Sequence, residues 1–535
     1  MSSEAAPVVR REYLAWLALS LAALASLAGW WMLGRPVALP DAPTSRIACV
    51  SYAPFREAGE SPLDPSAFVS AERVDADLRA LSQRFDCVRT YSQGQGLGAV
   101  PRIARRYGMK VLLGIWLGQD PKANDEQIRL GIAAARAYPD VVRAVIVGNE
   151  VLLRGELSSA QLAADLARVR AAVPEPVTYA DVWEFWLRHP ELAGSVDYLT
   201  IHVLPYWEDR PVPPEQAVQH VAAVYAKVSA AFPGRRVMIG ETGWPSAGRP
   251  RQAASASVVD EARYLRDFLR YAEETGLPYN VIEAFDQPWK RTLEGTVGGY
   301  WGIFDAQARP KFAMTGPVVE MARWWLGWLA AAVGGGVFVL AGAVRRKRSG
   351  WRETLALALA GVASGGAIAW QCRQMWFACR NPWEWAISLA ACLLAVLTAW
   401  RLARWIAARL AGASRPGGPG GWRTPWLFAL AYYGLLLVFD GRYRDFPLGL
   451  FALPCVGHAL AAWLCRAGER VLPSLEQRFL AACLPLLSVV VVVQEAGLNP
   501  TAWSWLGLNL LLAWPVWRAW RAGVRLQAQQ AQAAE

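Results

Sequence analysis

Short apolar segments alternate with helical patterns between residues 46 and 322 of this chain. An apolar run of four to six residues bounded by turn signals is typical of a strand buried on both faces. Strands that alternate with helices indicate a parallel sheet, and eight such units in about 275 residues fit a (β/α)8 TIM barrel of class α/β. The predicted strands are 47–52, 87–91, 110–116, 144–148, 177–179, 198–203, 237–240 and 280–285.

Two of these strands lead directly into glutamates. The fourth is followed by Asn149 and Glu150, and the seventh by Glu241. The carboxyl ends of parallel barrel strands face the active site, so we expect both glutamates at one edge of the sheet. Two glutamates about 5 Å apart are what retaining glycoside hydrolysis requires. A doubly wound sheet is the alternative fold, but it gives the glutamates no reason to converge. Either glutamate alone could instead cap the following turn.

The chain becomes strongly apolar after residue 322, which predicts an all-α polytopic transmembrane domain. Its overall hydrophobic content of 54% with 28 Trp exceeds that of ordinary soluble enzymes. One further apolar run lies near the N-terminus. The predicted spans are 13–33, 325–344, 354–370, 385–400, 426–439, 448–464, 479–493 and 504–517.

The net charge of +11 is unevenly distributed along the chain. Residues 323–535 carry 21 Lys and Arg against 8 Asp and Glu, whereas residues 1–322 carry 34 against 36. The excess sits in basic clusters between the apolar runs, near 345–348, 401–409, 466–478 and 518–525. This is the positive-inside pattern rather than a phosphate-binding face, so we expect no nucleic acid as a partner. It places both termini in the cytoplasm and the barrel outside, and the Arg- and Ala-rich composition suggests a bacterial inner membrane.

We therefore expect five parts in the chain. The first apolar run is longer than a usual signal peptide and ends in Trp30 and Trp31, which favours a retained anchor over a cleaved signal. The parts are a cytoplasmic tip with a signal-anchor helix at 1–35, a linker at 36–45, the barrel at 46–322, about seven transmembrane helices at 323–525 and a cytoplasmic tail at 526–535.

The cysteines and histidines give no sign of a metal or cofactor. Only Cys49 and Cys87 lie in the polar half, so we predict no disulfide framework there. Cys372 and Cys379 flank a predicted outer loop, where a disulfide and two separate thiols remain open alternatives. The four histidines are scattered and no Cys/His spacing fits zinc. His202, on a predicted strand, is expected to be a hydrogen-bonded barrel residue.

Several motifs resemble those of glycoside hydrolase family 17, which comprises β-1,3-glucanases and β-1,3-glucanosyltransferases. The resemblance covers the polar half of the chain and none of the apolar half. The matching segments are Gly-Asn-Glu-Val at 148–151, Gly-Glu-Thr-Gly-Trp-Pro-Ser at 240–246, Val-Arg-Thr-Tyr at 88–91, Val-Leu-Pro-Tyr at 203–206, Glu-Ala-Phe-Asp-Gln-Pro-Trp-Lys at 283–290 and Tyr-Trp-Gly-Ile-Phe at 300–304.

The resemblance implies a (β/α)8 fold and a retaining mechanism, with Glu150 as acid/base and Glu241 as nucleophile. Gln287 stands where plant members carry an acidic residue, with Glu283 earlier in the motif, closer to the fungal and bacterial pattern. The substrate-binding candidates are Asn149, Tyr52, Arg89, Tyr91, Asp181, Trp183, Tyr206, Trp244, Glu283, Gln287 and Lys290. For Arg89 we favour structural support. Trp186, Trp207 and Trp289 are further candidates for stacking on sugar rings, with core packing as an equal alternative.

These observations predict a membrane-anchored retaining enzyme that remodels a cell-envelope β-1,3-glucan by transglycosylation, including branching. Attachment to the membrane suits remodelling of a glucan that leaves the cell. An endo-β-1,3-glucanase is the close alternative, because water can replace the sugar acceptor. A non-catalytic glycan-recognition part of an export assembly is the alternative of another class. We expect β-glucan and the lipid bilayer as partners, with a membrane glucan synthase or export partner as a further candidate.

Overall fold

A computed structural model describes residues 5–345, 350–412, 422–465 and 472–534 of the chain. It contains two compact units. One unit is Val37–Val318, and the other joins the chain before Val37 to the chain after Val318. The strands β1 (Pro36–Val37) and β9 (Val318–Val319) pair with each other where the chain passes from one unit to the other.

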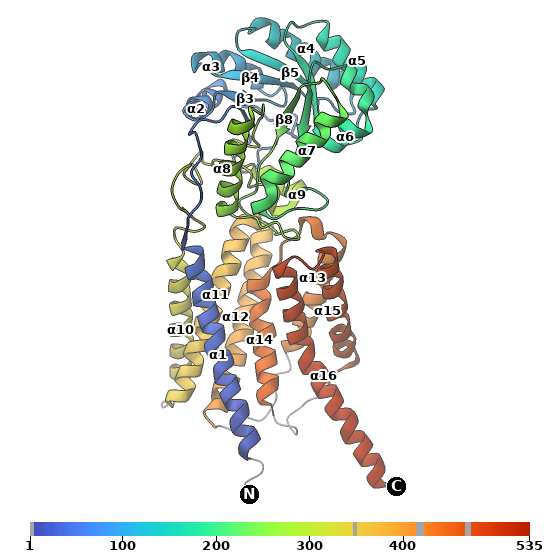
Figure 1. Cartoon of the computed structure of the whole chain (residues 1–535). Helices are drawn as coiled ribbons and strands as arrows, with labels where there is room; N and C mark the ends of the chain where they lie inside the picture. Colours follow the sequence, from blue (N-terminus) through green and yellow to red (C-terminus); the bar gives the residue numbers. More distant parts are fainter. Residues whose placement is uncertain (1–4, 346–349, 413–421, 466–471, 535) are drawn as a thin grey trace. The chain divides into compact units, whose positions relative to one another are not determined.

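The first unit is built on a parallel sheet of seven strands (Figure 1). Their spatial order equals their order in the sequence, so each strand pairs with the next one along the chain. The strands are β2 (Val50–Ser51), β3 (Cys87–Arg89), β4 (Lys110–Ile115), β5 (Val142–Asn149), β6 (Val177–Val182), β7 (Leu199–His202) and β8 (Val237–Glu241).

The segment predicted as the eighth strand lies between the two edges of this sheet. Tyr279 forms an isolated parallel bridge with Ile239 of β8, and Val281 forms one with Val50 of β2. The segment has bridges rather than a regular strand, because few consecutive residues pair on either side. A curved parallel sheet whose edges share one neighbouring segment fits a (β/α)8 fold.

Helices follow most of the strands and cover the sheet (Figure 1). Their polar N-caps Ser70, Asp120, Ser158 and Ser257 accept backbone hydrogen bonds from the first helical turn, which stabilises helix starts. The helices are α2 (Ala71–Leu81), α3 (Val100–Arg106), α4 (Pro121–Ala137), α5 (Ser159–Arg170), α6 (Trp183–Arg188), α7 (Ala217–Ala231), α8 (Val258–Thr275) and α9 (Arg291–Gly298). Short 3-10 helices lie at Leu97–Ala99, Pro190–Gly194, Pro214–Gln216 and Pro288–Lys290.

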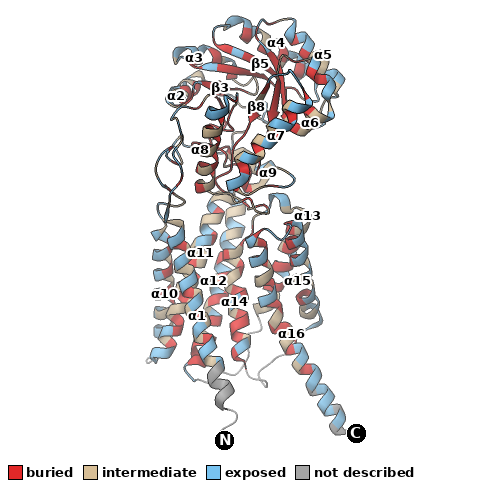
Figure 2. Ribbon diagram, viewed as in Figure 1, coloured by how far each residue is buried: buried red, intermediate tan, exposed pale blue. Residues whose placement is uncertain are grey.

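The side chains on the two faces of the sheet form two separate layers. Alternate residues such as Val145 and Val147 pack against helix residues in the main core, and most residues of the strands are buried (Figure 2). The residues between them point the other way, because successive strand side chains alternate faces. They form a separate small apolar cluster in the interior of the curved sheet, made of Cys49, Cys87, Leu112, Ala144, Ile146 and Ala180.

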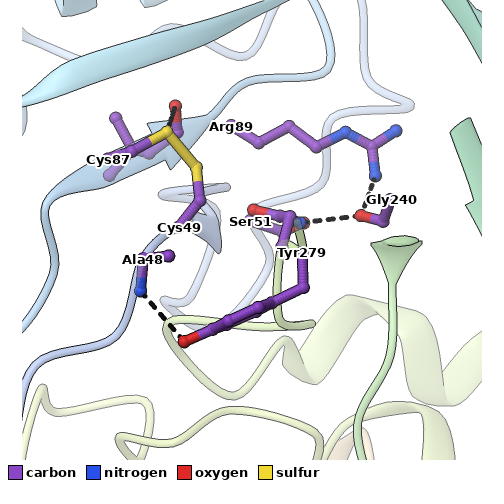
Figure 3. The surroundings of a disulfide bond; sticks show 9 residues. Ala48, Cys49, Ser51, Cys87, Arg89, Gly240 and Tyr279 are labelled. Carbon is purple, nitrogen blue, oxygen red and sulfur yellow. Dashed lines mark hydrogen bonds between the residues drawn. A yellow bond between two sulfur atoms is a disulfide. The ribbon is translucent and has the colours of Figure 1, made fainter. Parts of the chain in front are cut away.

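A disulfide joins Cys49 to Cys87 inside this cluster (Figure 3), so the polar half holds one disulfide, which the prediction of no disulfide framework did not foresee. The register pairs Val50 with Val88, so the residues preceding them are direct neighbours on adjacent strands. Their Cα atoms are 4.3 Å apart although 38 residues separate them in sequence. The count of cysteines alone could not reveal this register. Cys372 and Cys379 form no disulfide with each other.

The second unit consists of long apolar helices (Figure 1). Each of the eight predicted spans lies within one of them. They are α1 (Ala5–Leu33), α10 (Trp325–Arg345), α11 (Trp351–Ala378), α12 (Pro382–Leu410), α13 (Arg423–Phe439), α14 (Leu448–Leu464), α15 (Leu475–Gln494) and α16 (Pro500–Ala534), with a 3-10 turn at Gly441–Tyr443. Residues 346–349 and 466–471, which hold parts of the predicted basic clusters, lie outside the described residues, as do residues 413–421.

Five segments in the described part of the chain are long and apolar enough to cross a membrane. They are Arg11–Leu33, Trp325–Val344, Trp351–Ala378, Pro382–Leu410 and Leu475–Gln494. The N-terminal helix α1 packs into the same bundle, where Trp30 Nε1 donates to the carbonyl of Gly366 at 3.1 Å. Helices α10 and α11 approach so closely that a Cβ on Gly361 would lie 2.4 Å from the carbonyl oxygen of Gly334. Small residues at such contacts are characteristic of packed membrane helices.

Replacing both disulfide cysteines by alanine should destabilise the first unit. A crosslink over 38 residues restricts the unfolded chain, which corresponds to about 4 kcal/mol of unfolding free energy. Differential scanning calorimetry of the full chain in detergent would measure the loss as a lower Tm of the barrel transition. A reductant should lower the wild-type Tm and leave the double variant unchanged. Equal Tm values for the two proteins would contradict the prediction.

Candidate active site

Glu150 and Glu241 meet at the carboxyl edge of the sheet. β5 ends at Asn149, so Glu150 follows it directly, and β8 ends at Glu241 itself. Glu150 has a left-handed backbone conformation with φ of 54°, and Gly148 before it has φ of 82°. One oxygen of each glutamate and one ring nitrogen of His202 all lie within 4.8 Å of one another. The convergence expected from the two strand ends is therefore present.

Glu241 is buried among groups that favour its ionised form. Arg89 Nη1 donates to Glu241 Oε1 at 2.6 Å, and the Tyr91 hydroxyl donates to the same oxygen at 2.8 Å. Burial alone raises the pKa of Glu241, but the charges of His202, Arg89 and Lys290 and the Tyr91 hydrogen bond outweigh it. The net effect is a pKa below the ordinary value, so this carboxylate stays ionised in neutral solution.

Arg89 fixes several parts of the site at once. Its second terminal nitrogen donates to Asn149 Oδ1 at 2.5 Å, and Nη1 also donates to the carbonyl of Gly240 at 3.1 Å. Figure 3 shows this last bond beside the disulfide. The guanidinium therefore joins β3 to β5 and β8. This agrees with the structural role expected for Arg89, and it also places the residue in direct contact with a catalytic candidate.

Glu150 is more open than Glu241 and contacts a histidine. Its side chain is 23% exposed, against 6% for Glu241. His202 Nδ1 lies 2.8 Å from Glu150 Oε1, and His202 Nε2 lies 3.7 Å from Glu241 Oε1. A partly exposed carboxyl can reach a bound substrate, whereas the buried one approaches it from inside the barrel.

His202 is the main site residue that sequence reasoning missed. It is hydrogen bonded on a barrel strand, as predicted, but its hydrogen-bond partner is Glu150, and Glu241 is its second charged neighbour. The register of β7 and β8 pairs His202 with Glu241 across an irregularity after Ile201. Gly240 makes room for the ring, because a Cβ there would lie 3.1 Å from His202 Cδ2. The available signal was its position as the last residue of a strand beside the strand of Glu241.

Glu283 and Lys290 form a buried ion pair near the glutamates, with Lys290 Nζ 2.8 Å from Glu283 Oε2. Burial raises the pKa of Glu283 to about 7, although Lys290 opposes the shift. Glu294 was not predicted as a site residue. Burial raises the pKa of Glu294 to about 7 as well. Lys290 opposes this shift, and the negative charges of Glu150 and Glu241 add smaller upward effects. Lys290 thus balances part of a concentrated negative charge.

Asp181, Tyr52 and Trp183 lie around the site without hydrogen bonding to either glutamate among the described residues. Asp181 accepts from the backbone N–H of Val182 at 2.7 Å, and burial raises its pKa to about 6. The Tyr52 hydroxyl donates to Asp77 at 2.9 Å in the core. Trp183 Nε1 donates to Glu208 at 3.1 Å.

The structure buries several of the aromatic and amide candidates for sugar contact. Tyr206 and Trp244 are almost fully buried and pack edge to face, with ring centroids 6.0 Å apart. Trp186 Nε1 donates to the carbonyl of Thr200 at 2.9 Å. Gln287 is fully buried and accepts from Trp289 Nε1 at 2.8 Å. Trp207 and Trp289 are partly exposed. Core packing therefore accounts for the positions of Tyr206, Trp244, Trp186 and Gln287. Sugar contact by these residues stays a prediction.

Glu150, His202 and Glu241 are also the one group in the described part of the chain whose geometry could hold a metal ion. Arg89 already neutralises the Glu241 oxygen that faces His202. A cation at this position would have to compete with a guanidinium 2.6 Å away. The expectation of no metal and no cofactor stays a prediction.

Comparison with known proteins assigns the first unit. The family model of the BtgE/BtgC glycoside hydrolase domain matches residues 49–302. The first unit therefore resembles this glycoside hydrolase domain. The match contains both glutamates, His202, Glu283 and Lys290, and it confirms that the barrel is a glycoside hydrolase domain, as the motifs predicted. The apolar half lies outside the match.

Several fungal proteins are similar to this part of the chain. A glucan 1,3-beta-glucosidase of Arthroderma benhamiae is 26% identical over 44% of this chain and 82% of its own length. A probable beta-glucosidase btgE of Aspergillus fumigatus is 26% identical over 48% of this chain and 45% of its own length. A solved structure of a Rhizomucor miehei beta-1,3-glucanosyltransferase mutant with laminaritriose is 26% identical, with a TM-score of 0.44 over 52% of this chain and 98% of the other.

A second cluster of buried charges lies in the first unit, outside the site. Lys311 Nζ lies 3.0 Å from both Glu261 of α8 and Asp286, and it donates to Ser246 at 2.7 Å. Ser246 follows the Glu241 strand and Asp286 follows Glu283, so Lys311 ties the two loops of the site to α8. Burial raises the pKa of Glu261 to about 8 and that of Asp286 to about 6, against the opposing effect of Lys311.

These raised pKa values predict a pH-dependent stability. A carboxyl whose folded pKa exceeds its unfolded value stabilises the fold at low pH, and this contribution is lost as pH rises through the folded pKa. Glu261→Gln should therefore gain stability relative to wild type between pH 5 and pH 9, by roughly 2–4 kcal/mol at about 1.4 kcal/mol per pKa unit.

Thermal unfolding of the full chain at pH 5, 7 and 9 would measure this difference. Glu274→Gln, at an exposed position of the same helix, is the matched control and should follow wild type. A difference between Glu261→Gln and wild type that is constant with pH would show that burial does not hold the proton on Glu261.

Proposed function

We propose that this protein is a membrane-anchored retaining enzyme that cleaves β-1,3-glucosidic bonds and transfers the glycosyl group to another glucan chain. The observation that carries the proposal is the distance between the two carboxyl groups. Retaining glycosidases hold their carboxyl groups about 5–5.5 Å apart, whereas inverting enzymes need roughly 6.5–9.5 Å to admit a water molecule. Oxygens of Glu150 and Glu241 within 4.8 Å of each other support the retaining mechanism and a closed (β/α)8 barrel around them.

The roles follow from the two environments. Glu241, buried and ionised beside Arg89, attacks the anomeric carbon and forms a glycosyl-enzyme ester. Glu150, which is partly exposed, gives its proton to the leaving glycosidic oxygen. It then takes a proton from the acceptor hydroxyl, whose oxygen attacks the same carbon and releases the Glu241 carboxylate. Asn149, held by Arg89, is placed to hydrogen bond the sugar beside that carbon.

The substrate follows from the relatives and from the setting of the barrel. The named curated relatives include a glucan 1,3-beta-glucosidase, which supports a β-1,3-glucan. A water acceptor would give an endo-β-1,3-glucanase from the same two glutamates. We favour transfer, including branching, because an enzyme tied to its own membrane is suited to remodelling a cell-envelope β-glucan. A membrane glucan synthase or an export protein would be the corresponding partner.

The location is proposed from charge and from the disulfide. Five helices could span a membrane, and the basic residues concentrate between the apolar helices, which supports cytoplasmic termini in a bacterial inner membrane. Disulfides form and persist outside the reducing cytosol. The Cys49–Cys87 bond therefore supports a barrel on the periplasmic or extracellular side.

Substitution of each glutamate should separate their roles. Glu241→Gln should abolish turnover of every substrate. Glu150→Gln should lose about 10²- to 10⁴-fold on a laminari-oligosaccharide, the usual contribution of a general acid. It should still form the glycosyl-enzyme from 2,4-dinitrophenyl β-laminaribioside, because that leaving group needs no proton. Azide should then accelerate turnover and give a β-glycosyl azide.

Rates with the purified full chain and NMR of the azide product would test these roles. Glu274→Gln, an exposed glutamate of the barrel, should retain wild-type rates. An α-glycosyl azide, or full activity of Glu241→Gln, would contradict the retaining assignment.

The products from a laminari-oligosaccharide of one defined length should distinguish transfer from hydrolysis. Transfer yields chains longer than the starting oligosaccharide, which mass spectrometry detects, and β-1,6 signals in the NMR spectrum would identify branching. Exclusively shorter products would make the enzyme a glucanase and remove the argument for remodelling. The full chain in detergent or nanodiscs is the material for this measurement.

A further inference from the structure

The imidazole of His202 lies between the two glutamates and is completely buried. Its side chain is 0% exposed, with Nδ1 2.8 Å from Glu150 and Nε2 3.7 Å from Glu241. The second distance is too long for a hydrogen bond. No described residue accepts or donates a hydrogen bond at His202 Nε2. The ring therefore has one hydrogen-bond partner, Glu150, and one charged neighbour, Glu241.

Within the described part of the chain, the polar contacts of the two carboxyl groups all use one oxygen of each, Oε1. Arg89, Tyr91 and His202 approach Oε1 of Glu241, and His202 approaches Oε1 of Glu150. Among the described residues, no hydrogen bond reaches Oε2 of either glutamate. Oε1 is therefore the oxygen held by the protein in both residues, and Oε2 is left for the substrate.

The hydrogen bond to Glu150 has consequences for an acid catalyst. A protonated carboxyl carries its hydrogen on one oxygen, and the other oxygen can only accept. If Nδ1 carries a hydrogen, it donates to Oε1, and the acid proton must then sit on Oε2. If Nδ1 lacks one, the carboxyl donates to the ring from Oε1, and its proton points away from the substrate.

We propose that His202 is a positioning residue that donates Nδ1–H to Glu150 Oε1 and so keeps the acid proton on Glu150 Oε2. This inference rests on the proposed function of the two glutamates. His202 Nε2 faces Glu241 Oε1 at 3.7 Å on the other side of the ring. His202 keeps its Nδ1 hydrogen throughout: Oε2 gives its proton to the leaving oxygen in the first step and receives one from the acceptor hydroxyl in the second.

The same contact stabilises Glu150 after it has lost its proton. Hydrogen bonds to a carboxylate are stronger than those to a neutral carboxyl. The Nδ1–H bond therefore strengthens as the proton leaves Oε2, which lowers the barrier of the first step. A ring that merely fills the barrel interior would have no such effect.

Two substitutions separate the two ring nitrogens. In His202→Asn the side-chain amide nitrogen lies close to the position of Nδ1, so the donor to Glu150 remains. In His202→Gln it lies close to the position of Nε2, so the donor to Glu150 is lost. Both variants replace a buried ring by a neutral amide, which makes each the control for the other. The substrates are a laminari-oligosaccharide and 2,4-dinitrophenyl β-laminaribioside, with the purified full chain.

On the oligosaccharide, His202→Gln should lose about 10- to 100-fold in kcat/KM, part of the 10²- to 10⁴-fold that a general acid contributes. On the activated substrate, which needs no proton, its loss in kcat/KM should be at most about 3-fold, and His202→Asn should stay within about 5-fold of wild type on both. Equal losses on the two substrates would overturn the proposal and leave His202 a packing residue. The His202→Asn variant is also a test by itself. A loss of kcat/KM on the oligosaccharide as large as that of Glu150→Gln would overturn the proposal.

Failure of this inference differs from failure of the proposed function. Activity of Glu241→Gln would remove the catalytic assignment altogether. If Glu241→Gln is inactive and Glu150→Gln shows the leaving-group dependence while His202→Gln does not, the mechanism stands and the role of His202 is rejected. Thermal unfolding of each variant would show whether a loss of rate reflects a loss of folded protein.

Discussion

The guanidinium of Arg89 connects three strands with one buried charge. It donates to Glu241, to Asn149 and to the carbonyl of Gly240, and it is 1% exposed. A buried ion is stable only when a counter-ion and hydrogen bonds replace water, and Glu241 supplies the opposite charge. The nucleophile candidate and the interior of the barrel therefore depend on each other. Loss of Arg89 would remove the cation 2.6 Å from Glu241 and leave the buried carboxylate with the Tyr91 hydrogen bond and weaker electrostatic support.

The barrel interior is apolar near the strand starts and charged near the strand ends. Towards the strand starts it holds the disulfide and small apolar residues such as Ala144 and Ala180. At the strand ends it holds Arg89, His202 and the glutamates. Charges interact more strongly in an environment with little water. A few neighbouring side chains there can therefore give two carboxyl groups different electrostatic environments. The separation explains how neighbouring glutamates can differ in exposure and in the groups that contact them.

The sequence predicted features that depend on a single strand, but it missed features that depend on the alignment of two neighbouring strands. Glu150 and Glu241 each end an apolar run, so their convergence followed from the fold alone. The disulfide of Cys49 and Cys87 and the contacts of His202 depend on the register between neighbours, which no local pattern records. Aromatic residues posed a different problem. Tyr206 and Trp244 suit both a sugar platform and a core, and only the packing shows that both are buried.

Trp30 and Gly366 bond across 336 residues of sequence, with the whole barrel between them. During synthesis α1 leaves the ribosome long before α11 exists, so the helical unit must wait for the barrel to be translated. Closing so long a loop costs conformational entropy. The pairing of β1 with β9 brings the two ends of the barrel segment together, which shortens the effective loop. The helical bundle can therefore be completed only after the residues of the first unit have been translated.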